Sequence, residues 1–199
     1  MNIALFIKLF LALFAIMNPF VNLPIFLSVA KSKDHFGEVR LALLTSTSIF
    51  IMLLVIAIGG KEILSFFGIT IAGFKVAGGI ILFLIAYAML NAKSIRNNKD
   101  PNPAIVPIAT PVMVGPGAIS QVIAISSKAT HISDYTAIFA AIGTSSLLVL
   151  SVFASGTFIA KLLGTTGMNI ITRITAILIA ALAAEMVLEG LQEFFFLSR

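Results

Sequence analysis

The chain lacks cysteine and tryptophan, and only 11% of its 199 residues are charged. The absence of cysteine excludes disulfides and thiolate metal sites. The two histidines, His35 and His131, fall in polar connections between long apolar runs, so the sequence predicts no metal centre and no cofactor. Catalysis would need a base, a nucleophile or a metal, and the apolar runs contain no histidine, cysteine or aspartate. We therefore expect that the chain is not an enzyme.

Apolar residues dominate what is present. The hydrophobic fraction is 59% and the mean hydropathy is +1.11, well above the values of soluble globular domains. A helix needs roughly 18 to 20 apolar residues to cross about 30 Å of hydrocarbon. The sequence therefore predicts an all-α polytopic membrane protein with six transmembrane segments, at 3–30, 41–58, 71–90, 104–127, 135–160 and 170–190.

The net charge of +5 has a simpler explanation than an acidic partner, because basic residues concentrate in the loops that face the cytoplasm. We therefore expect no nucleic acid partner. Three connections, at 31–40, 91–103 and 161–169, hold most of the basic residues. Placing these connections in the cytoplasm puts both termini outside. The first run contains Lys8 and lacks a small-residue cleavage site ahead of Asn18, which indicates a retained span and not a signal peptide.

Two of the apolar runs carry the same interruption, a pair of prolines five residues apart. Pro19 and Pro24 lie in the first run, and Pro111 and Pro116 lie in the fourth. A proline inside a helix lacks a donor and clashes with the carbonyl four residues earlier, so both runs should be broken. Lipid does not tolerate the freed backbone groups, which survive only where protein buries them or where they line a wet cavity. A duplicated break is a sequence pointer to the binding site of a transporter.

The length of the first run supports a break, because a straight helix over 3–30 would be about 42 Å long and would overshoot the hydrocarbon. We expect one half-helix to end near Met17 and another to begin at Pro24. Pro24 and Pro116 both suit the first position of a helix, where the missing donor would be unpaired anyway. The first and fourth segments are therefore predicted to be broken or re-entrant.

The chain is predicted to form one membrane domain from two related halves, residues 1–95 and 96–199. An offset of 92 residues superimposes the two proline pairs, and a similar offset aligns Lys75 with Arg173. Each half then has a broken span, a plain span and a span with an early basic residue. Because three is an odd number, the second half enters the membrane from the opposite side, which gives two inverted three-helix repeats.

The residues around the breaks form the predicted binding site. A half-helix start offers free amide donors, and a half-helix end offers free carbonyls. Glycines flank Pro116, so a ligand can approach the backbone closely. The predicted substrate-binding residues are Asn18, Pro19, Asn22, Pro24, Thr110, Pro111, Gly115, Pro116, Gly117, Ala118 and Ser120.

This predicted cavity carries no formal charge, because no ionisable residue lies between Lys8 and Lys31 or between Asp100 and Lys128. Desolvating a bare charge without a counter-charge is costly, so an ion fits such a cavity poorly. A small zwitterion fits better, with its carboxylate at the amides of one half-helix and its ammonium at the carbonyls of another. The alternative is that the prolines only kink the helices and that neighbouring groups repair the lost hydrogen bonds.

Three ionisable residues inside the spans are candidates for coupling or gating, namely Lys75, Arg173 and Glu185. The basic pair lies near the start of its spans, where long side chains can instead reach the headgroups. Glu185 would suit a coupling proton if it points into the bundle. If it lies at the outer boundary beside Glu189 and Glu193, it is a solvated helix end, and the sequence leaves both interpretations open.

Three motifs together resemble one family: Met17 to Phe20 with Pro24 to Leu27, Phe74 to Gly79, and Pro111 to Ile119. Over essentially the whole chain, the sequence resembles the MarC family of six-span inner-membrane proteins, which includes small neutral amino acid transporters of the SnatA type. The resemblance implies proton-coupled symport of glycine, alanine and similar amino acids. In an inner membrane, the charge pattern places both termini in the periplasm. It also implies that the cavity is lined by Asn18, Pro19, Pro24, Gly115, Pro116 and Gly117.

The expected partners are therefore a small neutral amino acid, membrane lipids and protons. Two other functions stay open, since the sequence does not separate a carrier from a channel or exporter of small solutes, or from a membrane protein that transports nothing. It also leaves open whether copies of the chain form a homo-oligomer.

Overall fold

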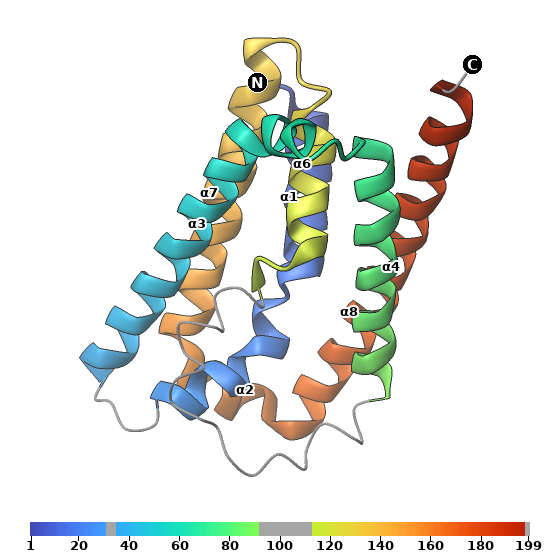
Figure 1. Cartoon of the computed structure of the whole chain (residues 1–199). Helices are drawn as coiled ribbons and strands as arrows, with labels where there is room; N and C mark the ends of the chain where they lie inside the picture. Colours follow the sequence, from blue (N-terminus) through green and yellow to red (C-terminus); the bar gives the residue numbers. More distant parts are fainter. Residues whose placement is uncertain (31–34, 92–112, 198–199) are drawn as a thin grey trace.

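The computed structural model describes residues 1–30, 35–91 and 113–197, and every regular element in these ranges is an α-helix. The predicted all-α class is confirmed. The helices, shown in Figure 1, are α1 (Ile3–Met17), α2 (Pro19–Ala30), α3 (His35–Phe66), α4 (Ile71–Leu90), α6 (Pro116–Ser126), α7 (Ile132–Ala154) and α8 (Gly156–Leu197).

Five helical segments of the described ranges are long and apolar enough to cross a membrane. They are Ile3–Leu27, His35–Phe66, Ile71–Leu90, Ile132–Ala154 and Gly156–Phe195. The fourth predicted span, 104–127, begins outside the described residues, and its described part holds the shorter apolar helix α6. The count of six spans therefore stays a prediction.

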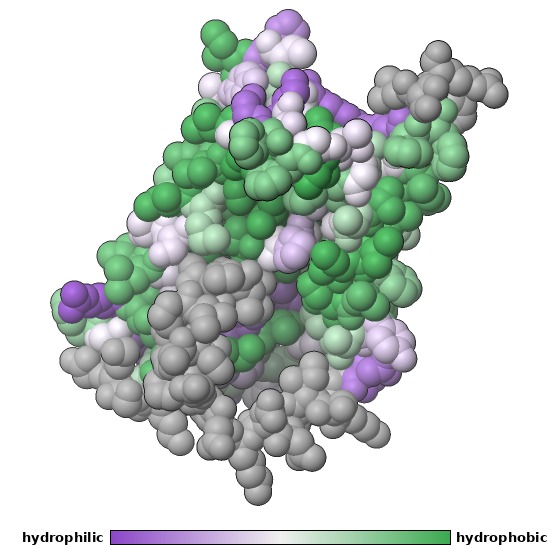
Figure 2. Space-filling view, in the orientation of Figure 1, coloured by the Kyte–Doolittle hydropathy of each residue, from purple (hydrophilic) through white to green (hydrophobic). Residues whose placement is uncertain are grey.

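The outer faces of the helices are apolar. Large side chains such as Ile58, Leu84 and Leu147 are 60% exposed or more. Figure 2 shows hydrophobic residues over most of one face, with hydrophilic residues toward its two ends. Water would penalise so much exposed apolar surface, whereas hydrocarbon does not. This surface agrees with a protein that lies in a membrane.

The buried apolar side chains form two separate clusters. The larger cluster joins α1, α2, α3, α6 and α7, with Leu9, Leu53 and Ile142 fully buried in it. The smaller cluster lies between α4 and α8 and consists of Leu82, Ala86, Ile179, Ala183 and Met186. Figure 1 shows α4 and α8 paired beside the remaining helices. We call each cluster with its helices a body; the two bodies contact each other through α4 with α6 and α8 with α2.

Glycines hold α4 and α8 close together. A Cβ atom on Gly79 of α4 would lie 2.8 Å from the carbonyl oxygen of Ala183, and one on Gly190 of α8 would lie 2.8 Å from the carbonyl oxygen of Ala72. Both neighbours are backbone atoms, which cannot turn aside as a side chain can. The close contact between these helices therefore depends on residues without side chains, as is common between membrane helices.

The last two helices differ from the predicted runs. The structure ends α7 at Ala154, before the predicted limit of 160, and α8 begins at Gly156 and extends over 42 residues. Inside α8, Gly164 has φ 58° and ψ −173°, which breaks the helical geometry. Only glycine adopts such a conformation at little cost. An apolar run does not show this bend, because the run continues on both sides of the glycine.

Candidate functional site

Helices α1 and α2 meet at one residue, Asn18, whose φ of 34° and ψ of 76° are left-handed. It is the one non-glycine residue with positive φ in the described ranges. The predicted end of a half-helix near Met17 is confirmed, since α1 ends there. The predicted start at Pro24 is wrong, because α2 begins at Pro19 and Pro24 lies inside it.

The side chain of Asn18 explains this earlier start. Its Oδ1 accepts a hydrogen bond of 3.2 Å from the amide of Val21, so it caps the first turn of α2. Pro19 then occupies the first helical position, where its missing donor costs nothing. In a continuous helix the Val21 amide would bond the Met17 carbonyl, and here Nδ2 of Asn22 donates to that oxygen at 2.9 Å instead. Local polar side chains therefore stabilise the interruption.

One polar group at the interruption has no hydrogen-bond partner. Asn18 is 3% exposed, and its Nδ2 has no hydrogen-bond partner among the described residues. An unsatisfied buried donor of this kind costs about 1–3 kcal/mol. Such a group is a candidate donor to a ligand or to a bound water.

Helix α6 begins at Pro116, as predicted, with Gly115 in the N-cap position and no side-chain cap. Its first amides therefore have no capping partner from a side chain. The next residues, Gly117 and Ala118, are buried. The space beside Gly117 is not open, because a Cβ there would lie 2.8 Å from Cδ1 of Leu82 on α4, and closer still to its Cγ.

The start of α6 lies level with the junction of α1 and α2 in Figure 1, and α6 contacts α1. Residues from both segments are buried in the same apolar cluster, namely Met17, Leu23, Met113 and Val114. Two predicted site residues of the second break, Thr110 and Pro111, lie outside the described residues. The structure thus brings together the described parts of the two predicted breaks.

Ser120 adds a second buried polar group without a partner. Its residue is 1% exposed, and its Oγ has no hydrogen-bond partner among the residues that the structure describes. It faces α4 at Gly78, where a Cβ would come within 2.6 Å of the Ser120 Cβ. The predicted site therefore contains two unused polar groups, on Asn18 and Ser120.

Lys75 is buried within the protein, at 1% exposure. Its Nζ lies 3.2 Å from Oε2 of Glu189 and 2.8 Å from Oε1 of Glu193. Its ammonium is therefore paired with carboxylates of the same chain. A buried ammonium without counter-charges would cost several kcal/mol, and two carboxylates one turn apart on α8 supply them.

Two further lysines extend this pairing to the larger body. Lys128, in the connection after α6, lies 2.8 Å from Oε1 of Glu193, and Lys8 of α1 lies 3.9 Å from Oε1 of Glu189. The hydrogen bond to Glu193 raises the pKa of Lys128 above its ordinary value. We call these five residues, Lys8, Lys75, Lys128, Glu189 and Glu193, the charge network.

This network was not among the predictions from the sequence. Glu189 and Glu193 entered them only as neighbours of Glu185 at a helix end, without a connection to Lys75. The spacing of four residues was a signal, because it places both carboxylates on one face of a helix. The missing information was the register of α4 against α8, which only the packing provides.

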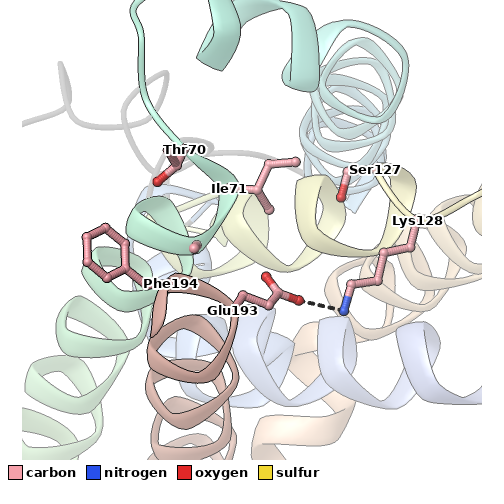
Figure 3. Close-up of a pocket in the computed structure, with 7 residues that line it drawn as sticks. Thr70, Ile71, Ser127, Lys128, Glu193 and Phe194 are labelled. Carbon is pink, nitrogen blue, oxygen red and sulfur yellow. Dashed lines mark ion pairs between the residues drawn. The ribbon is translucent and has the colours of Figure 1, made fainter. Parts of the chain in front are cut away.

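Two cavities lie beside the charge network. The larger, of about 500 Å³, is drawn in Figure 3, where Lys128 and Glu193 face each other; its lining consists of Thr70, Ile71, Ala72, Ser127, Lys128, Glu193 and Phe194. The second measures about 270 Å³ and is lined by Leu5, Lys8, Gln121, Ala124, Ile125, Lys128, Leu182, Glu185, Met186 and Glu189. We call this second cavity the outer pocket, because it lies toward the end that the charge pattern predicts to be outside.

The remaining two coupling candidates lie apart from each other. Glu185 is exposed and lines the outer pocket. Arg173 is exposed and makes no ion pair with any described residue. The structure therefore places Lys75 in the charge network and Glu185 beside it, and it does not bring Arg173 to them.

Comparison with known proteins agrees with this architecture. Residues 3–195 match the model of the MarC family integral membrane proteins. The chain is 37% identical to a UPF0056 membrane protein of Aquifex aeolicus, over 94% of this chain and 92% of the relative. It is 34% identical to one of Buchnera aphidicola from Schizaphis graminum, over 98% and 95%.

A third relative is the UPF0056 membrane protein YhcE of Escherichia coli, which is 32% identical over 96% of this chain and 93% of the relative. None of these three names states a substrate. No solved structure matches the chain. The match spans nearly every residue and confirms the resemblance, so the chain belongs to the MarC family of multi-pass integral membrane proteins.

Proposed function

We propose that the chain is a secondary transporter of small neutral amino acids such as glycine and alanine, and not an enzyme. The observation that carries the proposal is the interruption at Asn18. It lies inside an apolar candidate span, Ile3–Leu27, and it leaves a buried side-chain donor unused. Irregular backbone at membrane depth is tolerated where it is buried in protein or lines a cavity, and it is a feature of transporter binding sites.

The chemistry of the interruption supports a solute without net charge. No ionisable residue lies between Lys8 and Lys31 in the sequence, and the groups on offer are the Asn18 amide, the Ser120 hydroxyl and the uncapped start of α6. The helix start and the Asn18 Nδ2 donor favour a carboxylate, and the Ser120 oxygen can accept a hydrogen bond from an ammonium. An amino acid zwitterion satisfies both without leaving an uncompensated charge.

The two packed bodies support movement by alternating access. Helix α4 comes from residues 1–95 and α8 from residues 96–199, the two halves that we propose to be inverted repeats. These two helices form the smaller cluster, whereas the helices around the interruptions form the larger one. Rocking of one body against the other around a fixed site is the mechanism common to such repeats. We propose that both termini face the periplasm.

We further propose that transport is coupled to protons through Glu185. This carboxylate lines the outer pocket, where protonation changes the local charge without breaking an ion pair. The coupling is tested by collapsing the pH gradient across proteoliposomes while the substrate gradient and the voltage are clamped. Unchanged flux would show that no proton is carried.

Uptake of labelled glycine and alanine into proteoliposomes tests the proposal. The critical variant is Asn18→Gly, because glycine adopts the left-handed conformation and is a tolerated N-cap, so the helix junction is kept while the amide is removed. We expect saturable uptake by the unmodified protein and a decrease of about tenfold or more in the variant. Asn91→Gly, at the exposed end of α4, is the matched control.

A second candidate function is a passive channel for small solutes. It predicts flux that does not saturate and no counterflow of labelled against unlabelled amino acid. Uptake no greater than in empty liposomes, for every amino acid tried, would refute the transporter proposal.

A further inference from the structure

We propose that the outer pocket is a separate binding site for an amino acid zwitterion, with Glu185 holding the ammonium and Lys8 and Gln121 holding the carboxylate. The identity of the solute as an amino acid rests on the proposed function. The location and the charge requirement rest on the pocket itself.

Two of the four charged groups that line the pocket are already engaged. Lys128 donates to Glu193 at 2.8 Å, and Glu189 accepts from Lys75 at 3.2 Å. These groups form part of the pocket wall, but their ion pairs leave few hydrogen-bonding positions for a ligand.

Three groups of the lining make no side-chain hydrogen bond with a described residue. Glu185 makes no ion pair or side-chain hydrogen bond with any described residue. Lys8 has its nearest carboxylate oxygen, on Glu189, at 3.9 Å, which is beyond hydrogen-bond distance, and its side chain is 65% exposed. Gln121 lines the pocket and is 9% exposed, and its side chain makes no hydrogen bond with another described residue.

These groups specify the ligand by its charges. A cation would satisfy Glu185 and leave Lys8 and Gln121 unused, and an anion would do the reverse. A molecule with one ammonium and one carboxylate engages all three groups and preserves the charge balance of the pocket. The apolar part of the wall, which includes Leu5, Ile125 and Met186, can receive a small side chain.

The size of the pocket agrees with a small solute. Pockets for drug-sized ligands begin at about 300 Å³, and the outer pocket measures about 270 Å³. Its position also fits the proposed transport, because Gln121 directly follows Ser120 on α6. One helix thus connects the outer pocket with the interruption, and we infer that a solute from the outside meets the pocket first.

The test is equilibrium binding of labelled glycine to the purified full chain in lipid nanodiscs. Binding is measured in an Asn18→Gly background, which removes the donor at the interruption and isolates the outer pocket. The variants are Glu185→Gln and Lys8→Met, which remove charge and keep side-chain length. The controls are Glu62→Gln and Lys61→Met, at exposed positions of α3 that do not line the pocket.

We expect each pocket variant to raise the Kd for glycine by about tenfold or more, as for the loss of a charge-assisted hydrogen bond. The controls should leave the Kd unchanged. Acetate and methylammonium, which each carry one of the two charges, should compete with glycine at least tenfold more weakly than alanine does. Equal binding by Glu185→Gln and the Asn18→Gly parent, or competition by methylammonium as strong as that by alanine, would overturn the inference.

The uptake assay separates this inference from the proposed function. Saturable uptake together with unchanged glycine binding by both pocket variants would overturn the outer pocket and leave the transporter standing. Glycine binding that depends on Glu185, without uptake in proteoliposomes, would overturn the transporter and leave the pocket standing. Neither binding nor uptake of any amino acid would overturn both.

Discussion

Replacing Lys75 by methionine should destabilise the protein far more than removing an exposed lysine. The Lys75 side chain is 2% exposed and lies between two carboxylates, at 3.2 and 2.8 Å. Methionine has nearly the same length, so the packing between α4 and α8 is kept. The substitution leaves Glu189 and Glu193 close together without the ammonium that separates their charges.

The size of the effect depends on the ion-pair partners and the solvent exposure that each carboxylate retains after the substitution. Breaking a buried ion pair from one side costs about 3–5 kcal/mol. After the substitution, Glu193 still has Lys128 at 2.8 Å, and the side chains of Glu189 and Glu193 are 43% and 24% exposed. Solvent and Lys128 therefore reduce the cost of leaving the two carboxylates without Lys75, and we expect a loss of stability at the low end of this range, about 3 kcal/mol. For a chain of this length, that corresponds to a decrease in Tm of about 6–12 °C.

Thermal unfolding in detergent measures this effect. Because the chain has no tryptophan, the signal should be helical circular dichroism and not intrinsic indole fluorescence. Lys61→Met, at an exposed position of α3, is the control and should change Tm by less than about 2 °C. A triple variant, Lys75→Met with Glu189→Gln and Glu193→Gln, should recover most of the loss, because no buried charge is then left unpaired and the lysines that lose their partners, Lys8 and Lys128, are 65% and 62% exposed.

The outcome that would refute this reasoning is a Lys75→Met variant as stable as the Lys61→Met control. A triple variant less stable than Lys75→Met alone would also refute it, because the carboxylates would then stabilise the fold by another contact.

Three further predictions concern the backbone and the charge network. Gly79→Ala should destabilise the fold by about 1–3 kcal/mol, because the new Cβ meets the backbone of Ala183. Gly59→Ala, with no atom within 4 Å of the new Cβ, should be tolerated, and thermal unfolding compares the two variants. Asn22→Ala should cost about 1–3 kcal/mol in the same assay, because it leaves a buried carbonyl without its donor, and an unchanged Tm would contradict this. The raised pKa of Lys128 contributes stability that is full below pH 10.5 and decreases as pH rises through the folded-state pKa. A Lys128→Met variant should therefore have a lower free energy of unfolding than the parent protein at pH 8, and the two free energies should converge at high pH.

The sequence predicted the places of the interruptions better than their form. Paired prolines indicated that a helix ends near Met17 and that another begins at Pro116, and both are confirmed. The prolines did not indicate that α2 begins at Pro19, because this depends on Asn18 adopting a left-handed conformation and capping the helix with its own side chain. Conformations of single residues are not encoded in the spacing of prolines.

The candidate site was predicted in part for a similar reason. Apolar patterning identified Lys75 as an intramembrane charge, but it gave no partner, since the partners come from a helix more than 100 residues later. Gly117 was expected to open space for a ligand, and the structure fills that space with Leu82 of α4. Contacts between distant segments decide both cases, and a single sequence does not contain the register of those contacts.

The glycine contacts between α4 and α8 have a mechanical consequence. The close contacts at Gly79 and Gly190 hold α4 and α8 together, so we expect the two helices to move as one unit. The ion pairs of Lys75 lie within this unit, whereas Lys8 and Lys128, whose side chains are 65% and 62% exposed, pair it with the larger body. Exposed pairs are worth about 0–1 kcal/mol each. Moving the unit away from the larger body therefore costs little in ion pairs and leaves the pairing of Lys75 intact, and its main cost is the packing of α4 on α6 and of α8 on α2.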